Sequence, residues 1–227
     1  MTDRISVRFW RDGVESPSLF QQGSLRMRFI KSAVWFCAAA AFAACSAPEE
    51  SPEQTGLAQQ EAALTTGTTQ GCTYSITADS VPGTVPPRYS VSVTRAASST
   101  CPWPEASVTL DTGSYAFPAR ALLANSYGLA VTYTGKYSPS GSSPTSCSVR
   151  QIDPETLAVV RSSGVAVWLG SGNIYSCNLD QTDGGATLVV FGTKNGRIYG
   201  ETGSGSNYVA TYYDFFTTTT APVFYAY

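Results

Sequence analysis

The chain has 227 residues, a formal net charge of −2 from 14 Lys and Arg against 16 Asp and Glu, and no histidine. Without a basic excess it lacks the electrostatic footprint of a nucleic-acid-binding protein, so we expect no nucleic-acid partner. Without histidine, Ser-His-Asp and Cys-His catalytic systems and His-based metal sites are excluded.

The first segment, residues 1–26, has mixed charge and no clear hydrophobic period. It would place the basic start of the following signal-like segment far from the amino terminus. We therefore interpret residues 1–26 as a misannotated extension ahead of a true start at Met27. A cytoplasmic arm before an uncleaved anchor is the alternative.

Residues 27–45 have the pattern of a signal peptide. Arg28 and Lys31 form a short basic region, and the apolar or small residues 33–44 follow it. This run has the length of a signal-peptide core and is too short to span a bilayer. An ordinary signal peptide cleaved after Ala43 and a short buried helix remain open as alternatives.

The signal segment ends in Phe42-Ala43-Ala44-Cys45, which resembles the lipobox of bacterial lipoproteins. Phe42 stands where that family usually has Leu or another aliphatic residue. The resemblance covers the signal segment alone, and it implies a lipid on the Cys45 thiol and cleavage just before it. The expected location is the cell envelope, with a membrane as partner through the lipid anchor. Ser46 after the cysteine favours the outer membrane in that family's sorting pattern, with either face open.

Residues 46–70 contain four glutamates, two prolines and almost no large apolar side chains. Such a segment cannot bury enough surface to offset the entropy lost on ordering. We therefore predict a disordered tether here, followed by one domain over residues 71–227.

The domain shows a hydrophobic period of two, which is typical of half-buried strands. No amphipathic helix of useful length is predicted, although Ala119–Ala124 could form one or two helical turns. The predicted strands are residues 89–94, 106–110, 129–134, 147–152, 156–160, 165–169, 173–177, 186–191, 197–199, 208–216 and 223–227. About ten short strands indicate an all-β fold, most simply a β-sandwich. A stretch at residues 179–200 resembles a blade of bacterial β-propellers, so a small propeller-like or barrel-like domain is the alternative.

Asn195-Gly196 is the strongest local turn signal in the domain. Both residues accept the positive φ angles of a type I′ turn, so residues 186–200 are predicted to form a β-hairpin.

Four cysteines lie in the domain, at positions 72, 101, 147 and 177. An even number in an exported domain indicates disulfides, because the bacterial periplasm is oxidising. Separations of 29 and 30 residues favour Cys72–Cys101 and Cys147–Cys177 among the three possible pairings. A zinc site is disfavoured because there is no CxxC pair and no histidine.

The sequence around Asp111, Val-Thr-Leu-Asp-Thr-Gly-Ser, resembles the active-site turn of aspartic proteases. That chemistry needs two carboxylates sharing a proton, and the chain has one such motif. The resemblance therefore implies a homodimeric peptidase with Asp111 as its catalytic residue. The alternative is a strand that ends in an ordinary turn at Asp111 and Gly113.

Two further patterns leave the function open. Asn178, Asp180 and Asp183 suggest a calcium loop, but their spacing departs from the EF-hand pattern, so we expect a turn, no metal and no cofactor. Aromatic residues crowd positions 208–227 and indicate either an exposed platform for a glycan or protein ligand, or core positions of terminal strands. The sequence favours a binding or structural module over an enzyme.

Overall fold

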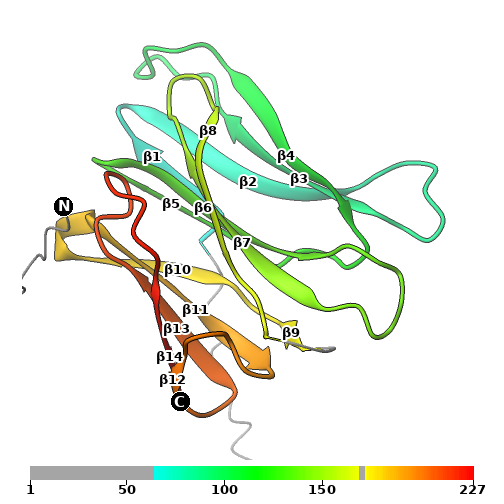
Figure 1. Cartoon of the computed structure of the whole chain (residues 1–227). Coiled ribbons are helices and arrows are strands. Elements are labelled where there is room, and N and C mark those ends of the chain that lie inside the picture. Colours follow the sequence, from blue (N-terminus) through cyan, green and yellow to red (C-terminus); the bar gives the residue numbers. More distant parts are fainter. Residues whose placement is uncertain (1–63, 169–171) are drawn as a thin grey trace, which may run out of the picture. The chain divides into compact units, whose positions relative to one another are not determined.

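Hydrophobic alternation in this chain produces two packed sheets of mostly antiparallel strands (Figure 1). The computed structural model describes residues 64–168 and 172–227, which lie in one compact unit. One sheet has the strand order β1-β2-β3-β4, and the other runs β12-β14-β13-β11-β9-β7-β6-β5, with β10 on β11 and β8 on β7. The strands are β1 (Thr66–Thr69), β2 (Cys72–Ser80), β3 (Tyr89–Arg95), β4 (Ala106–Ser114), β5 (Arg120–Asn125), β6 (Gly128–Lys136), β7 (Thr145–Ile152), β8 (Val159–Val165), β9 (Asn173–Ile174), β10 (Asn178–Thr182), β11 (Thr187–Asn195), β12 (Thr202–Gly203), β13 (Asn207–Tyr212) and β14 (Val223–Ala226).

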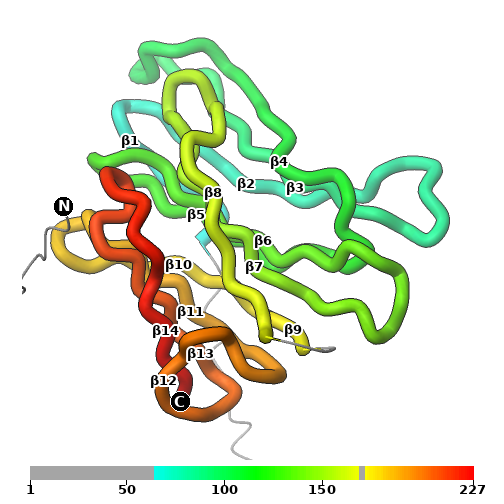
Figure 2. Tube along the Cα trace, viewed as in Figure 1, coloured from blue at the N-terminus to red at the C-terminus, as the bar shows by residue number. Residues whose placement is uncertain are grey.

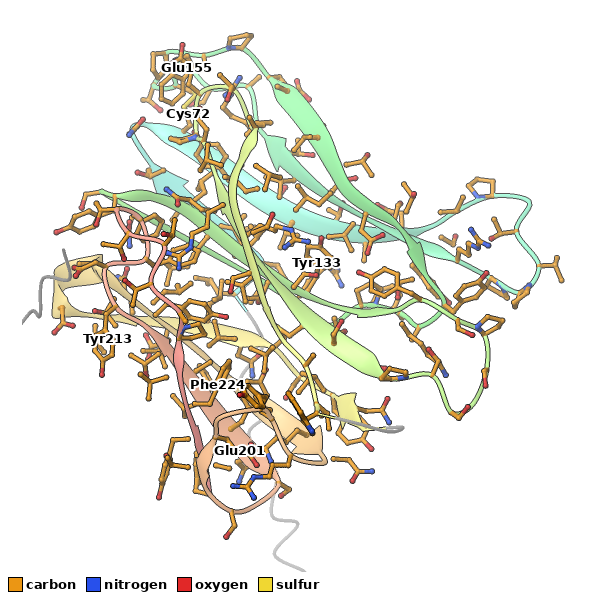
Figure 3. The ribbon with its side chains drawn as sticks, viewed as in Figure 1. Cys72, Tyr133, Glu155, Glu201, Tyr213 and Phe224 are labelled. Atoms are coloured by element: carbon orange, nitrogen blue, oxygen red, sulfur yellow. A yellow bond between two sulfur atoms is a disulfide. The ribbon has the colours of Figure 1, made fainter. Side chains whose placement is uncertain are left out.

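Strands β5 and β6 are covered on both faces, because β1–β4 pack on one side and β10–β14 on the other (Figure 1). Successive side chains of a strand point to opposite faces. In β6, Leu129 and Val131 therefore join the core shared with β2 and β3, whereas Ala130 joins the core shared with β11 and β13. This explains why β6 is buried along almost its whole length. Figure 3 shows Tyr133 of β6 on the side that faces β2 and β3.

The outer face of the β1–β4 sheet carries hydroxyl side chains in place of apolar ones. Two pairs of these hydroxyls hydrogen-bond across neighbouring strands, Ser92 with Thr109 at 3.2 Å and Thr94 with Ser107 at 3.0 Å. Such a sheet, apolar inside and polar outside, is the usual arrangement when one face meets water.

The two disulfides have the predicted partners. Cys72 at the start of β2 bonds Cys101 ahead of β4, with Cα atoms 4.4 Å apart. Cys147 in β7 bonds Cys177 just before β10, with Cα atoms 6.0 Å apart. With the all-β architecture, these bonds confirm a disulfide-stapled β-sandwich. No closed barrel forms within the described ranges.

Two predictions are wrong, the start of the folded domain and the helical turns at Ala119–Ala124. The folded domain begins before residue 71, because Thr66–Thr69 form β1 along β2 and so belong to the sheet, not to a tether ending at residue 70. Ala119–Ala124 is not helical: β5 covers most of it and pairs with β6. A run of small and branched residues is helical or extended according to its neighbours, and here two apolar layers enclose it.

Strand positions between residues 153 and 177 also differ from the prediction. Asp153 caps a turn by accepting hydrogen bonds from the amides of Glu155 and Thr156, so that β8 starts only at Val159. Of the predicted strand 165–169, Val165 ends β8, Val167 makes a single bridge to Ile198, and residue 169 lies outside the described residues. The predicted strand 173–177 is reduced to the two residues of β9.

The predicted hairpin over residues 186–200 does not form. Strand β11 pairs with β13 and β10, and residues 197–199 contribute only the bridge of Ile198 to Val167. Gly196 does have a positive φ of 110°, as a turn requires. Instead of reversing directly, the chain makes a longer connection, residues 196–206, that carries β12. Figure 2 traces it from β11 to β13, close to the C-terminal end.

Candidate functional site

A buried lysine organises the β11–β13 connection. In β11 the even-numbered positions face the core, as Leu188 and Val190 do, and Lys194 continues this series with only 5% of its surface exposed. Its ammonium group donates hydrogen bonds to the carbonyls of Gly196 at 2.9 Å and Gly205 at 3.0 Å. A buried charge needs such partners, so the two ends of the connection are drawn around one ammonium group.

Glu201 supplies the counter-charge and is 7% exposed. Its Oε1 accepts a hydrogen bond from Lys194 Nζ at 3.3 Å, and its Oε2 lies 3.2 Å from the same nitrogen. Oε2 nevertheless receives no hydrogen bond of acceptable geometry and is shielded from solvent. Figure 3 shows Glu201 within the β11–β13 connection. Oε2 is therefore held by the positive charge of Lys194 without a well-aligned hydrogen bond.

Lys194 and Glu201 lie at an open pocket of about 290 Å³. Arg197 borders the same pocket with 76% of its side chain exposed, and its Nε lies 4.0 Å from Glu201 Oε1. The lining residues are Lys194, Gly196, Arg197, Glu201, Gly203, Ser204 and Gly205. The pocket thus combines a buried ion pair, an exposed guanidinium group and a glycine-rich wall.

The glycines of this wall allow a close approach to β14. Gly203 and Gly205 have φ angles of 76° and 145°, which side chains rarely adopt. A Cβ atom at Gly203 would clash with the Ala226 carbonyl, and one at Gly205 would clash with the backbone of Tyr227. Only glycine therefore lets this wall pack against the C-terminal strand.

An exposed aromatic pair lies next to Arg197, outside the residues that line the pocket. The rings of Trp168 and Tyr199 stack with centroids 4.2 Å apart and planes inclined by 21°. They are 50% and 69% exposed, respectively. Ile198, which is buried, separates the exposed residues Arg197 and Tyr199, and the Trp168 amide donates to the Arg197 carbonyl at 2.6 Å. Arg197 therefore lines the pocket and also connects it to the stacked rings.

The structure places Asp111 within β4, not at a turn, where the pairing with β3 is irregular near Val91. One carboxylate oxygen accepts a hydrogen bond from the Gly113 amide and the other from the Tyr137 hydroxyl, both at 2.8 Å. Burial, together with the hydrogen bond and charge of Asp111, raises the pKa of Tyr137 to about 12. The predicted turn is wrong, and the peptidase interpretation stays a prediction.

The C-terminal aromatic residues divide between core and surface. Tyr208, Tyr212 and Phe215 are fully buried, and Figure 3 shows Phe224 directed inward and Tyr213 directed outward. The outward-facing Tyr225 and Tyr227 stack on each other at 6.2 Å. Core positions therefore account for part of this region, and a ligand platform formed by the exposed rings stays a prediction.

The candidate calcium residues do not converge. Asn178 and Asp180 belong to β10, and Asp183 begins a short 3₁₀ turn, where its carboxylate accepts a hydrogen bond from Thr187 Oγ1. Among the described residues, no group of three or more acidic, cysteine or histidine side chains could hold a metal ion. Over the same residues, no helix is long and apolar enough to cross a membrane.

Sequence reasoning did not identify Lys194, Arg197, Glu201, Trp168 or Tyr199 as site residues. The one feature of the sequence that could have indicated the site was Lys194, a charged residue at an inward position of an otherwise apolar strand. Comparison with protein-family models, curated proteins and solved structures finds no match to the chain.

Proposed function

We propose that this protein is a cell-envelope lipoprotein whose β domain binds a saccharide at the pocket beside Trp168 and Tyr199. The observation that carries the proposal is the exposed, stacked pair Trp168 and Tyr199 next to the exposed guanidinium group of Arg197. A sugar ring matches this arrangement because it offers hydroxyl donors at its rim and an apolar C–H face.

The aromatic pair and Arg197 would divide the recognition. An aromatic ring, apolar on its faces, can cover the C–H face of a sugar. Glu201 would not touch the ligand, because its side chain is only 4% exposed, but through Lys194 it would hold the wall of the pocket in place. Arg197 presents its guanidinium donors at the pocket rim, where 76% of its side chain is exposed. The volume of about 290 Å³ lies at the small end of ligand pockets, which supports a ligand of one or two sugar rings.

Trp168→Ala and Tyr199→Ala should each weaken saccharide binding about fivefold or more, because aromatic anchors of binding sites contribute over about 1 kcal/mol. Binding is measured by affinity electrophoresis in gels that contain neutral or carboxylated polysaccharides. Both side chains are half-exposed or more, so their removal should leave folding intact.

Tyr127→Ala is the matched control. Tyr127 is 48% exposed and stacks on Phe216 at 6.1 Å, but it lies at the β5–β6 turn, in a different segment from the stacked pair Trp168 and Tyr199. Equal losses of affinity in all three variants would contradict the proposed site. So would unchanged affinity in both Trp168→Ala and Tyr199→Ala.

The envelope location rests on the lipobox-like sequence that ends at Cys45. We expect Cys45→Ser to shift the protein from the membrane fraction to the soluble fraction, because the variant lacks the thiol that carries the lipid. Cys37→Ser, within the same signal segment, is the control and should remain membrane-bound. Membrane retention of Cys45→Ser after a high-salt wash would refute lipid anchoring at this residue.

A further inference from the structure

The charges of the pocket do not cancel. Lys194 and Glu201 neutralise each other at 3.2 Å, and their side chains are only 3% and 4% exposed. Arg197 is the remaining charged residue of the pocket lining. Its Nε is 4.0 Å from a carboxylate that Lys194 already occupies, at the limit of an ion pair. The rim of the pocket therefore carries a positive charge that faces solvent.

This charge is local and does not reflect the domain as a whole. Residues 72–227 contain nine acidic and eight basic residues, a net charge of −1 (8 − 9). An acidic polymer would gain little from the overall field of such a domain, so any preference for negative charge has to come from the site itself.

The position of Arg197 determines which substituent of a bound sugar would meet its guanidinium group. Backbone pairing holds Arg197 next to Trp168, and Tyr199 lies two residues further along the chain. A sugar ring on the aromatic pair would thus direct an edge substituent towards the guanidinium group. A carboxylate accepts two parallel hydrogen bonds from guanidinium, which a hydroxyl cannot do.

From this arrangement we infer that the pocket selects a sugar residue that carries a carboxylate, with Arg197 as the residue that determines the selectivity. The inference rests on the proposed saccharide-binding function and specifies its ligand class. The aromatic pair would cover the C–H face, and Arg197 would bind the carboxylate.

The test uses the full-length protein in affinity electrophoresis against polygalacturonate, alginate and hyaluronan. Each polymer is compared with its carboxyl-reduced form, in which the carboxylate has become a neutral –CH₂OH group on the same sugar backbone. Poly-L-glutamate is included as a carboxylated polymer without sugar rings. At least one carboxylated polysaccharide should bind, and its carboxyl reduction should weaken binding about 10- to 100-fold, as expected for a charge-assisted hydrogen bond.

Arg197→Gln should cause the same loss towards the carboxylated polymer and a much smaller loss towards its reduced form. Arg197→Lys should restore part of the affinity, because it keeps the charge without the planar fork. Gln is compatible with folding at a side chain that is 76% exposed. Higher salt should weaken binding of the carboxylated form alone, because exposed charges are screened.

Three results would overturn the inference, and they separate it from the proposed function. If both polymer forms bind equally and binding depends on Trp168 and Tyr199, the carboxylate selectivity is rejected and the saccharide site is retained. If poly-L-glutamate binds as tightly as the carboxylated polysaccharides, the ligand is an acidic peptide and the saccharide proposal is rejected. No binding to any polymer of the panel would reject both proposals.

Discussion

Arg95→Met is expected to lower the free energy of unfolding by about 3 kcal/mol, the combined effect of losing charge-assisted hydrogen bonds to backbone carbonyls. Arg95, at the end of β3, is only 3% exposed. Its guanidinium group donates to the carbonyls of Pro104, Pro154 and Glu155, and it lies 5.6 Å from the centre of the Trp103 ring. One side chain thus fastens two loops to the first sheet.

Methionine keeps much of the length of this side chain and removes all its donors, so the three carbonyls would be left to partial hydration. Urea unfolding of the full-length protein, followed by tryptophan fluorescence, measures the change. The control is Arg88→Met, since Arg88 also lies over an aromatic ring, Tyr115 at 4.8 Å, but is exposed. We expect that control to cost less than about 1 kcal/mol, as for other exposed charged side chains. If Arg95→Met is as stable as the control, the hydrogen bonds of Arg95 to the three carbonyls contribute little to stability.

Replacing Cys147 and Cys177 together by alanine should destabilise the domain by about 4–5 kcal/mol. The 30-residue separation alone predicts a loss of about 3–4 kcal/mol from the chain entropy of the unfolded state. Both sulfur-bearing residues are also 1% exposed in the core between β7 and β11, so their removal leaves a poorly packed region. A loss of this size is a large part of the stability of an ordinary domain.

The other disulfide provides an internal comparison for this experiment. Cys72 and Cys101 are 29 residues apart, so the entropic loss should be nearly the same, but Cys101 is partly exposed. The double alanine variant at 72 and 101 should therefore be less affected, by about 1 kcal/mol. Thermal unfolding of both variants under the same conditions gives the two values. A larger loss at Cys72–Cys101 would contradict the role assigned to burial.

The predictable part of this fold is the part encoded by a strict period of two. Strands β3, β6 and β7 alternate regularly and appear in the structure close to their predicted positions. The disulfide partners were also predictable, because the two closest cysteine spacings match the two bonds. The central position of β6 was not, because alternation alone does not reveal that both faces of a strand are covered.

The site could not be predicted because it depends on a long-range contact that replaces a local preference. Asn195-Gly196 favours a tight hairpin, but the inward-facing Lys194 needs the Gly205 carbonyl and the Glu201 carboxylate as partners. These partners come from residues seven to eleven positions further along the chain. Satisfying a buried charge outweighs the preference of one dipeptide, so the chain builds a longer connection. The pocket is a consequence of that connection.

The stacking of Trp168 on Tyr199 depends in the same way on one bridge between distant segments, Val167 with Ile198. Both aromatic residues lie in predicted strands, residues 165–169 and 197–199, but alternation does not reveal that these two segments meet. By contrast, Asp111 stood out in the sequence because Asp-Thr-Gly resembles the aspartic-protease motif. Its carboxylate nevertheless accepts hydrogen bonds from Gly113 and Tyr137 within a strand. Short motifs show residue types, whereas a binding site depends on which distant residues meet.

The most direct test of saccharide recognition is an NMR titration of the ¹⁵N-labelled protein with an oligosaccharide from the carboxylated polymer that binds most tightly. The largest shifts are expected at the Trp168 indole N–H, the Arg197 Nε–H and the Tyr199 amide, with little change at the Tyr127 amide. Shifts confined to the hydroxyl face of β1–β4 or to the surroundings of Tyr213, or no shifts at saturating ligand, would contradict the assignment of this pocket as the binding site.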